Sequence, residues 1–387
     1  MSNQNSNSNL SHTYVQLQST NVPSFSSYVY FDIALTSHCI HDVILQISTG
    51  PITGITGGLL ASTFPHLATA YKWFTQCTIT NGNNTLSQFD SQSNYILNQL
   101  YTSNEDAVFL NNGSGPYDNA GARYTLSNTS TVWLIPIKEF FAQCRPEILN
   151  QNSTIRVSIL MDSLANILNV GSLAGTGSVV INSMSLLMKV TKYDNQLTSL
   201  KLNQPMKQPL MKTYNTTNYQ PYTIATGTTQ SILSLSNFVN QQVQFIYFVI
   251  KPVANTKNDT ILFSNNILNY SLVSSSGENI NGGSSILPVQ SLLVYNRLNT
   301  LGNFTSNSSY GNVFTVFYSS DSISTICNQG GVYGSRVFNG AESIVINYSS
   351  ALTQPFQLDI YASCTSIYKQ NQNATIIKLI VKYKYKK

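Results

Sequence analysis

Charged side chains are scarce in this sequence of 387 residues. Asp, Glu, Lys and Arg together make up 9% of it, whereas about 25% is typical of soluble domains. Because Glu and Lys normally coat the wet face of a helix, their scarcity argues against long exposed helices. The 17 Phe and 23 Tyr residues are too many for a disordered chain, and aromatic side chains favour strands. We therefore predict a folded, all-β protein.

Patterns that carry catalytic or metal-binding chemistry are also missing from the sequence. It contains no GxSxG motif and no phosphate-binding glycine loop. The adjacent acidic pair Glu105-Asp106 fits a solvated turn, because neighbouring residues on a strand point to opposite faces. His38, Cys39 and His41 form the one cluster of potential ligands, but a metal site needs three or four ligands in one geometry. We expect no catalytic residue, no cofactor and no metal, and the chain is not predicted to be an enzyme.

Cysteine pairs, a signal peptide and membrane spans are not evident either. Residues 1–11 are rich in Asn and Ser and have neither a basic cluster nor an apolar core, so no signal peptide is expected. The long uncharged stretches are interrupted by Gly, Pro, Asn and Thr, which fits strands and loops better than membrane spans. The five cysteines have no Cys-x-x-Cys spacing, which is typical of buried thiols rather than of a disulfide framework: Cys39, Cys77, Cys144, Cys327 and Cys364.

Short apolar or alternating segments separated by turn residues recur along the whole chain, which is the pattern of β-sandwiches and jelly rolls. The second half repeats the theme of the first, so we predict a duplicated domain rather than a short-repeat array. The predicted strands of the first half are Ser27–Leu35, His41–Ile47, Tyr71–Thr80, Ser93–Leu100, Thr131–Ile135, Thr154–Met161 and Val179–Tyr193. Those of the second half are Ser231–Leu235, Val243–Ile250, Ile267–Val273, Val313–Tyr318, Ser343–Tyr348, Phe356–Ser363 and Thr375–Tyr385.

Two short helices and a linker complete the predicted organisation. One helix covers Ile137–Cys144, with Pro136 at its first position, and the other lies around Val289–Leu298. Leu200–Tyr222 is rich in Pro and Lys and has little periodicity, which favours a linker. The predicted parts are a disordered N-terminal arm (1–12), a first barrel (13–197), the linker (198–222), a second barrel (223–381) and a basic C-terminal tail (382–387).

The C-terminal end of the chain concentrates positive charge. From Ile377 onward apolar residues alternate with lysines, so one face of the strand should enter a core and the other should be basic. A basic face of this kind attracts anionic lipid headgroups or nucleic acid without sequence specificity, although it could equally be a solubilising end. The candidate contact residues are Lys378, Lys382, Lys384, Lys386 and Lys387.

Four segments, taken in order, resemble the double jelly-roll major capsid proteins of tailless icosahedral DNA viruses, the adenovirus-like lineage. YKWFTQCTITNGNNTLSQFDSQSNYIL (Tyr71–Leu97) is similar to early strands of the first barrel. VWLIPIKEFFAQCRPEILNQNSTIRVSILMD (Val132–Asp162) is similar to its later strand, Phe-rich helix and returning strand. VNQQVQFIYFVIKPVANTKNDTILFSN (Val239–Asn265) is similar to the long aromatic strand of the second barrel, and FNGAESIVINYSSALTQPFQLDIYASCTSIYKQNQNATIIKLIV (Phe338–Val381) to its closing strands.

The resemblance implies a fold, a function and a set of partners. It implies two tandem eight-stranded jelly-roll barrels with a few short helices, and a homotrimer that forms a pseudo-hexameric capsomer of an icosahedral shell. It further implies contacts with neighbouring capsomers, with vertex or penton proteins and with cement proteins, assembly in the host cytoplasm, and a place in the virion. The basic C-terminus would then face internal membrane lipids or packaged DNA.

Two other classes of function also fit a chain of this composition. A secreted β-sandwich adhesin, surface-layer or fibre protein would have the same Asn-, Ser- and Tyr-rich character, although it would be expected to carry a signal peptide. A β-sandwich lectin or carbohydrate-active enzyme is less compatible with two tryptophans and 15 carboxylates.

Overall fold

A computed structural model of the chain contains mainly β-strands, and the predicted all-β fold is confirmed. The longest helix among the described residues, α1, covers Ser91–Tyr101. None of the helices among the described residues is both long and apolar enough to cross a membrane. The described residues are 12–54, 73–101, 129–148, 154–167, 177–194, 210–253, 267–274, 276–279, 285–286, 313–318, 335–370 and 376–380.

The first half of the chain forms two antiparallel sheets that face each other. Sheet I contains, in order across the sheet, β1 (His12–Gln18), β9 (Ile181–Lys192), β3 (His38–Thr49) and β6 (Thr131–Pro136). Sheet II contains β2 (Tyr28–Ile33), β8 (Ile155–Met161), β4 (Phe74–Asn81) and β5 (Asn84–Asp90). The smaller elements are β7 (Glu147–Ile148), which pairs with β3, and the single turns α4 (Phe141–Cys144) and α5 (Leu164–Ile167). Counted along the chain, the main strands lie first-eighth-third-sixth and second-seventh-fourth-fifth, which is the jelly-roll order.

The second half repeats this order. Sheet III contains β10 (Leu210–Ile224), β17 (Phe356–Gln370), β12 (Gln242–Pro252) and β14 (Val313–Phe317), and sheet IV contains β11 (Gln230–Ser234), β16 (Ser343–Tyr348) and β13 (Ile267–Val273). β15 (Arg336–Val337) pairs with β12, β18 (Ile376–Ile380) pairs with β17, and η4 (Ser236–Phe238) is a short 3-10 turn. The order is again first-eighth-third-sixth and second-seventh-fourth. A fifth strand would fall between β13 and β14, where most residues lie outside the described part.

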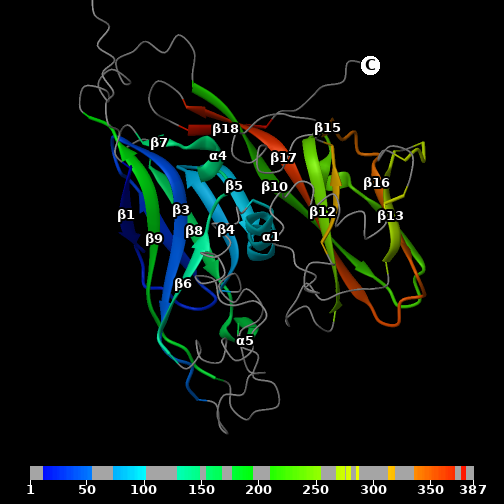
Figure 1. Cartoon of the computed structure of the whole chain (residues 1–387), viewed down its shortest axis with the longest axis horizontal. Coiled ribbons are helices and arrows are strands. Elements are labelled where there is room, and N and C mark those ends of the chain that lie inside the picture. Colours follow the sequence, from blue (N-terminus) through cyan, green and yellow to red (C-terminus); the bar gives the residue numbers. More distant parts are fainter. Residues whose placement is uncertain are drawn as a thin grey trace, which may run out of the picture.

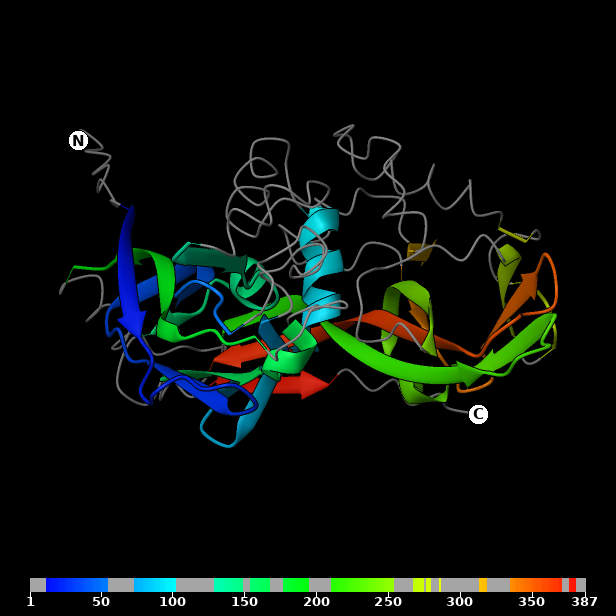
Figure 2. The ribbon, with the colours of Figure 1, turned by 90° about the horizontal axis from the view of Figure 1, so that it is seen from below.

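The four sheets are stacked side by side in the order I, II, III and IV, with α1 between sheets II and III (Figure 1). One apolar core fills the space between sheets I and II, and a second fills the space between sheets III and IV. Strand alternation explains both cores: Val29, Phe31 and Ile33 of β2 enter the first, and Ile344 and Ile346 of β16 enter the second. Viewed from below, the two barrels lie next to each other along the long axis of the molecule (Figure 2).

Three predictions of local structure need correction. Ser93–Leu100 is not a strand but part of α1. Asp90 directly precedes this helix, and its Oδ1 accepts a hydrogen bond from the Ser93 backbone N–H (2.6 Å), which caps the helix. The buried amides of Asn94 and Asn98 donate to the Pro136 carbonyl oxygen at 3.2 and 2.9 Å, so polar residues stabilise the buried side of this helix.

The helix predicted for Ile137–Cys144 is reduced to the single turn α4. Pro136 ends strand β6 instead of starting the helix, because the Ile137 backbone N–H donates to the Val43 carbonyl oxygen (2.8 Å) and so continues the contact with β3. Phe140 has a φ of +70°, which interrupts a right-handed helix before Phe141. The helix predicted at Val289–Leu298 lies outside the described residues.

The linker predicted for residues 198–222 is wrong for residues 210–222, which belong to the 15-residue strand β10. Pro221 is tolerated there because β10 lies at the edge of sheet III and pairs only with β17 among the strands of that sheet. Residues 1–11 of the predicted arm lie outside the described part, and His12 already belongs to β1.

Both faces of sheet III are buried at β12, so two adjacent residues of this strand, Tyr247 and Phe248, should each stabilise a different contact. Tyr247 stacks on Tyr361 toward the first barrel (5.0 Å between ring centroids), whereas Phe248 stacks on Phe314 in the second core (5.0 Å). Both side chains are fully buried. Tyr247→Ala and Phe248→Ala should therefore each lower the free energy of unfolding by about 3–5 kcal/mol, measured by chemical denaturation.

The exposed Tyr28 provides the control, and Tyr28→Ala should cost no more than about 1 kcal/mol. A comparably small loss for Tyr247→Ala would contradict the packing of sheet III against the first barrel.

Candidate functional site at the joint between the two barrels

A long two-stranded ribbon, β10 paired with β17, belongs to sheet III and also reaches the first barrel. The two strands pair along the whole of β10, from Leu210 opposite Gln370 to Ile224 opposite Phe356. Near one end, Tyr214 and Tyr368 pack against Phe140 of the first barrel, with ring centroids 5.4 and 5.8 Å away. The Tyr214 hydroxyl donates to the Leu86 carbonyl oxygen (2.5 Å). The ribbon therefore anchors the second barrel to the first.

A buried carboxylate, Glu139, links the same ribbon to the segment between β6 and α4. It accepts hydrogen bonds from the Ser87 hydroxyl (2.5 Å) and from the backbone N–H and hydroxyl of Thr217 (3.1 and 2.9 Å). The residue is only 5% exposed. Several donors on one carboxylate offset the cost of burying its charge, so this contact holds β5, β10 and the β6–α4 segment together.

Tyrosines of sheet III form the centre of the joint. Tyr361 stacks between Tyr247 and Tyr219, with centroid distances of 5.0 and 5.1 Å. Their hydroxyls reach the start of α1: Tyr361 donates to Asp90 Oδ2 (2.9 Å), and the Tyr247 and Ser93 hydroxyls are hydrogen-bonded (2.8 Å). The joint thus combines aromatic packing with polar contacts of defined geometry.

An ion pair lies beside these tyrosines. Lys251 Nζ is 2.8 Å from Asp359 Oδ2, and the side chains are 15% and 2% exposed. Burial alone would raise the pKa of Asp359, but the Lys251 ammonium and hydrogen bonds from Gln357 and Tyr219 hold it below its ordinary value. The Gln92 amide of α1 also donates to Asp359 Oδ2 (3.2 Å), so the pair is tied to the first barrel.

The pKa of Asp90 is shifted in the opposite direction, above its ordinary value. Burial raises the pKa of its carboxyl from 3.8 to about 6, against the opposing effect of hydrogen bonds from the Ser93 N–H and the Tyr361 hydroxyl. The nearby negative charge of Asp359 adds to the increase. Asp90 therefore titrates in a range where most aspartates are fully ionised.

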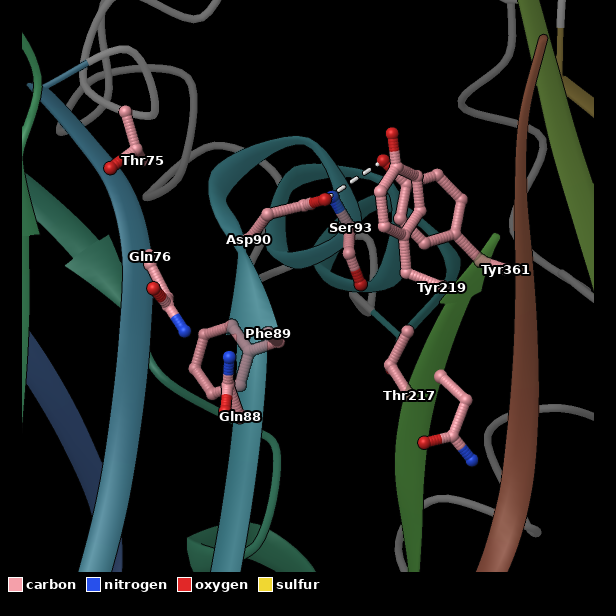
Figure 3. A pocket seen from close by; sticks show the side chains of 10 residues that line it. Thr75, Gln76, Gln88, Phe89, Asp90, Ser93, Thr217, Tyr219 and Tyr361 are labelled. Carbon is pink, nitrogen blue, oxygen red and sulfur yellow. Dashed lines mark hydrogen bonds between the residues drawn. The ribbon is translucent and has the colours of Figure 1, made fainter. Parts of the chain in front are cut away.

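A pocket of about 440 Å³ opens beside Asp90 between the outer faces of sheets II and III (Figure 3). Its wall contains one carboxylate and otherwise neutral side chains, which offer hydrogen bonds but no pair of groups for acid–base catalysis. The lining residues are Thr75, Gln76, Gln88, Phe89, Asp90, Ser93, Thr217, Asn218, Tyr219 and Tyr361. The described residues also contain no group of three potential metal ligands.

The predicted basic face is described at one position only. Lys378 lies on β18 opposite Tyr368 of β17, and β18 also lies against β5 of the first barrel. Lys382, Lys384, Lys386 and Lys387 lie outside the described residues, so the predicted lipid or nucleic-acid contact stays a prediction.

The histidines near Cys39 are engaged in hydrogen bonds with neighbouring groups of the chain. His41 Nε2 and His12 Nδ1 lie 2.8 and 2.9 Å from the Thr191 hydroxyl. His38 Nδ1 lies 2.7 Å from the Thr36 carbonyl oxygen. The described cysteines, Cys39, Cys77, Cys144 and Cys364, are all buried thiols, as predicted, while Cys327 and the Glu105-Asp106 pair lie outside the described residues.

The residues of the joint were not predicted, although the sequence contains a signal for them. Lys251 and Asp359 interrupt apolar strands in a chain with very little charge. A charge within such a strand is costly unless it is paired, so a buried ion pair between the two strands could have been predicted.

The raised pKa of Asp90 predicts a stability difference that depends on pH. A folded-state pKa above the unfolded value contributes stability that is fully present below about pH 4 and is lost as the pH rises through about 6. Asp90→Asn stays neutral, so it should leave stability nearly unchanged at about pH 3 and raise it by about 1–3 kcal/mol at about pH 7.5.

Denaturant titrations at both pH values measure this difference. Asp32 is the control, because hydrogen bonding to Arg156 lowers the pKa of its carboxyl, and Asp32→Asn should give no gain at the higher pH. An equal effect of Asp90→Asn at both pH values would show that Asp90 does not titrate in this range.

Comparison with known proteins gives a likeness in structure but not in sequence. No family model and no curated relative matches the chain. Among solved structures, the chain is similar to PBCV-1 VP54, as fitted into a reconstruction of the virophage Sputnik (TM-score 0.68, 11% identity, 97% of this chain and 98% of that chain). It is also similar to the Faustovirus major capsid protein (TM-score 0.66, 9% identity, 92% and 90%) and to the mavirus major capsid protein (TM-score 0.55, 11% identity, 96% and 90%).

These identities are low, so the likeness concerns the fold, and it extends over nearly the whole of each chain. Together with the duplicated strand order, it shows that this chain has the double jelly-roll fold of viral major capsid proteins.

Proposed function

We propose that this chain is the major capsid protein of an icosahedral virus and that three copies form one capsomer of pseudo-hexameric outline. The observation that carries the proposal is the duplicated jelly-roll order, in which each copy supplies two similar barrels side by side. Three such copies would place six similar barrels around one axis, a shape that tiles a curved shell. The likeness to three viral capsid proteins supports the same conclusion.

The joint supports a structural rather than a catalytic role. A shell subunit must keep the angle between its barrels constant, because small errors in that angle add up around a ring. The barrels are fastened at several separate points: by the ribbon β10–β17, by the buried Glu139, and by Gln92 of α1, which hydrogen-bonds to both members of the Lys251–Asp359 pair. Among the described residues that line the pocket, Asp90 is the one group that could act as a general acid or base near neutral pH, and it caps α1 instead.

The remaining partners and the location follow from this role. The proposed subunit contacts neighbouring capsomers, different proteins at the fivefold vertices and cement proteins, and it resides in the virion after assembly in the host cytoplasm. The basic C-terminal residues are proposed to face anionic material inside the shell, either membrane headgroups or packaged DNA.

Electron microscopy of the purified chain tests the proposed capsomer. Class averages should show particles with three times the 42.7 kDa mass of one chain and a six-lobed outline. Monomers at every concentration, or head-to-tail fibres, would contradict the proposal and favour a surface-layer or fibre protein.

Removal of the basic tail tests the proposed inner contact separately. A chain lacking residues 382–387 should form trimers as well as the full chain does, because the change leaves both barrels intact. It should give fewer complete particles, since several phosphate-attracting charges are lost. Particle yield in an expression system with all shell components measures the effect, and an unchanged yield would refute the contact.

A further inference from the structure

The pocket at the joint is bounded by both barrels. Its volume is about 440 Å³, which lies toward the lower end of the range for small-molecule sites. Gln76 and Gln88 line it from β4 and β5 of the first barrel. Tyr219 and Tyr361 line it from β10 and β17 of the second, and Asp90 lies between the two walls (Figure 3). A compact molecule bound here would therefore contact both barrels at once.

The wall of the first barrel presents amides beside one carboxylate. Strand register places Gln76 directly opposite Asp90, and Gln88 lies two residues before Asp90 on the same face of sheet II. Gln88 is exposed and Gln76 is half-buried. Each amide can donate and accept hydrogen bonds, so this wall suits a ligand with a polar group.

The wall of the second barrel presents an aromatic ring. Tyr219 lies directly opposite Tyr361, and their ring centroids are 5.1 Å apart. The Tyr219 hydroxyl donates to Asp359 Oδ1 (2.7 Å), which holds the ring in place. Tyr219 is 41% exposed, so part of its surface remains available for contact. A fixed tyrosine ring favours an apolar ligand body and attracts a nearby cation.

Asp90 can accept further hydrogen bonds from a bound molecule. Its Oδ1 accepts from the Ser93 backbone N–H (2.6 Å), and its Oδ2 accepts from the Tyr361 hydroxyl (2.9 Å). An ionised carboxylate has about four acceptor positions, so these bonds leave room for donors from the pocket.

The charges around Asp90 do not balance. The Lys251 ammonium acts on Asp90, but it lies 2.8 Å from Asp359 Oδ2 and is paired there. Among these three groups, two carboxylates and one ammonium leave one negative charge once Asp90 is ionised. A partly buried charge without an opposite charge is costly, and a cation in the pocket would offset that cost.

We propose that the pocket binds a compact organic amine, with its ammonium group on Asp90 and its body against Tyr219. The ammonium donates charge-assisted hydrogen bonds to the carboxylate, and the glutamine amides of the first wall bind a polar group elsewhere on the ligand. This site does not depend on the proposed capsomer, because both walls belong to one chain.

Other ligand classes match the pocket less well. Hard cations such as Mg²⁺ and Ca²⁺ take about six or more oxygen ligands, usually including carboxylates. The described lining residues supply one carboxylate, and the described part of the chain contains no group of three potential metal ligands. A neutral polyol could use the amides, but it would leave the charge of Asp90 unmatched. The wall therefore favours a ligand with a single positive charge.

Amine binding should depend on pH, because Asp90 must be ionised. Burial raises the pKa of its carboxyl to about 6. Burial also raises the pKa of each tyrosine that faces Asp90, further above neutral pH. It opposes the ionisation of Asp359, but the Lys251 ammonium and hydrogen bonds hold the pKa of Asp359 below its ordinary value. The charge of Asp90 should thus control binding in the mildly acidic range. The tyrosines are Tyr219, Tyr247 and Tyr361.

Titration of the full chain with tyramine and with tyrosol tests the proposal. The two probes share a phenol ring and an ethyl chain, but tyramine ends in an ammonium and tyrosol in a neutral hydroxyl. Ligand-observed NMR at about pH 7.5 should show tyramine binding about 10-fold more tightly than tyrosol, because hydrogen bonds between charged groups are stronger. At about pH 5 the tyramine affinity should fall about 10-fold, since most of Asp90 is then protonated.

Two variants separate the charge from the space. Asp90→Asn can still cap α1 but lacks the charge, so tyramine should bind about 10-fold more weakly and no better than tyrosol. Gln88→Trp keeps the charge but fills the pocket from an exposed position, so both probes should lose binding. Asp32→Asn is the matched control: Asp32 lies on sheet II outside the pocket, paired with Arg156, and this variant should bind tyramine as the wild type does. Circular dichroism checks that each variant is folded.

Each result decides the assignment. Loss of the preference for tyramine in Asp90→Asn and at about pH 5 would support it. Equal affinity of the wild type for both probes would indicate a site for neutral polar ligands and would overturn the amine. Tyramine binding that is unchanged in Asp90→Asn or in Gln88→Trp would show that the amine binds elsewhere. No binding at about 10 mM would also overturn the proposal, because a ligand of this size should have a Kd of about 1 mM or less.

Discussion

The burial of sheet III on both faces is the constraint on which the rest of the architecture depends. In most antiparallel sandwiches one face of each sheet meets water. Here every residue of β12 except Lys251 is buried. From Phe245 to Ile250, odd positions such as Tyr247 face the first barrel and even positions such as Phe248 face the second core. One strand therefore stabilises two barrels at once, and the barrels cannot separate without exposing aromatic surface from both.

The joint combines two kinds of interaction that serve different purposes. Aromatic packing around Tyr361 supplies the apolar burial, which favours association of the barrels without fixing one angle. The directional contacts of Glu139 with Thr217, of Asp90 with Tyr361 and of Asp359 with Gln92 restrict that angle, because these hydrogen bonds are lost when the barrels rotate. A rigid two-barrel subunit follows from having both.

Much of this fold could be predicted from the sequence, because alternation and turn residues act locally. The strands predicted at β2, β3, β8 and β16 are confirmed for that reason. The errors arose where distant contacts decide the structure. Residues 210–222 look like a linker because Pro and Lys interrupt them, and only pairing with β17, about 150 residues later in the chain, makes them a strand. The helix α1 was mistaken for a strand, although Asp90 three residues before Ser93 offered a capping signal.

The positions of the described charged side chains suggest a structural reason for the scarcity of charge. Lys251, Asp359 and Glu139 are buried in the joint, where the covalent chain brings the partners together and each charge meets a fixed set of donors or an opposite charge. The outer faces of sheets I and IV carry almost none. Desolvating a charge between separate copies costs free energy at every assembly step, whereas within one chain it is compensated once, during folding. A subunit that must pack against many copies of itself is thus expected to keep its charges at internal joints and its outer sheet faces neutral.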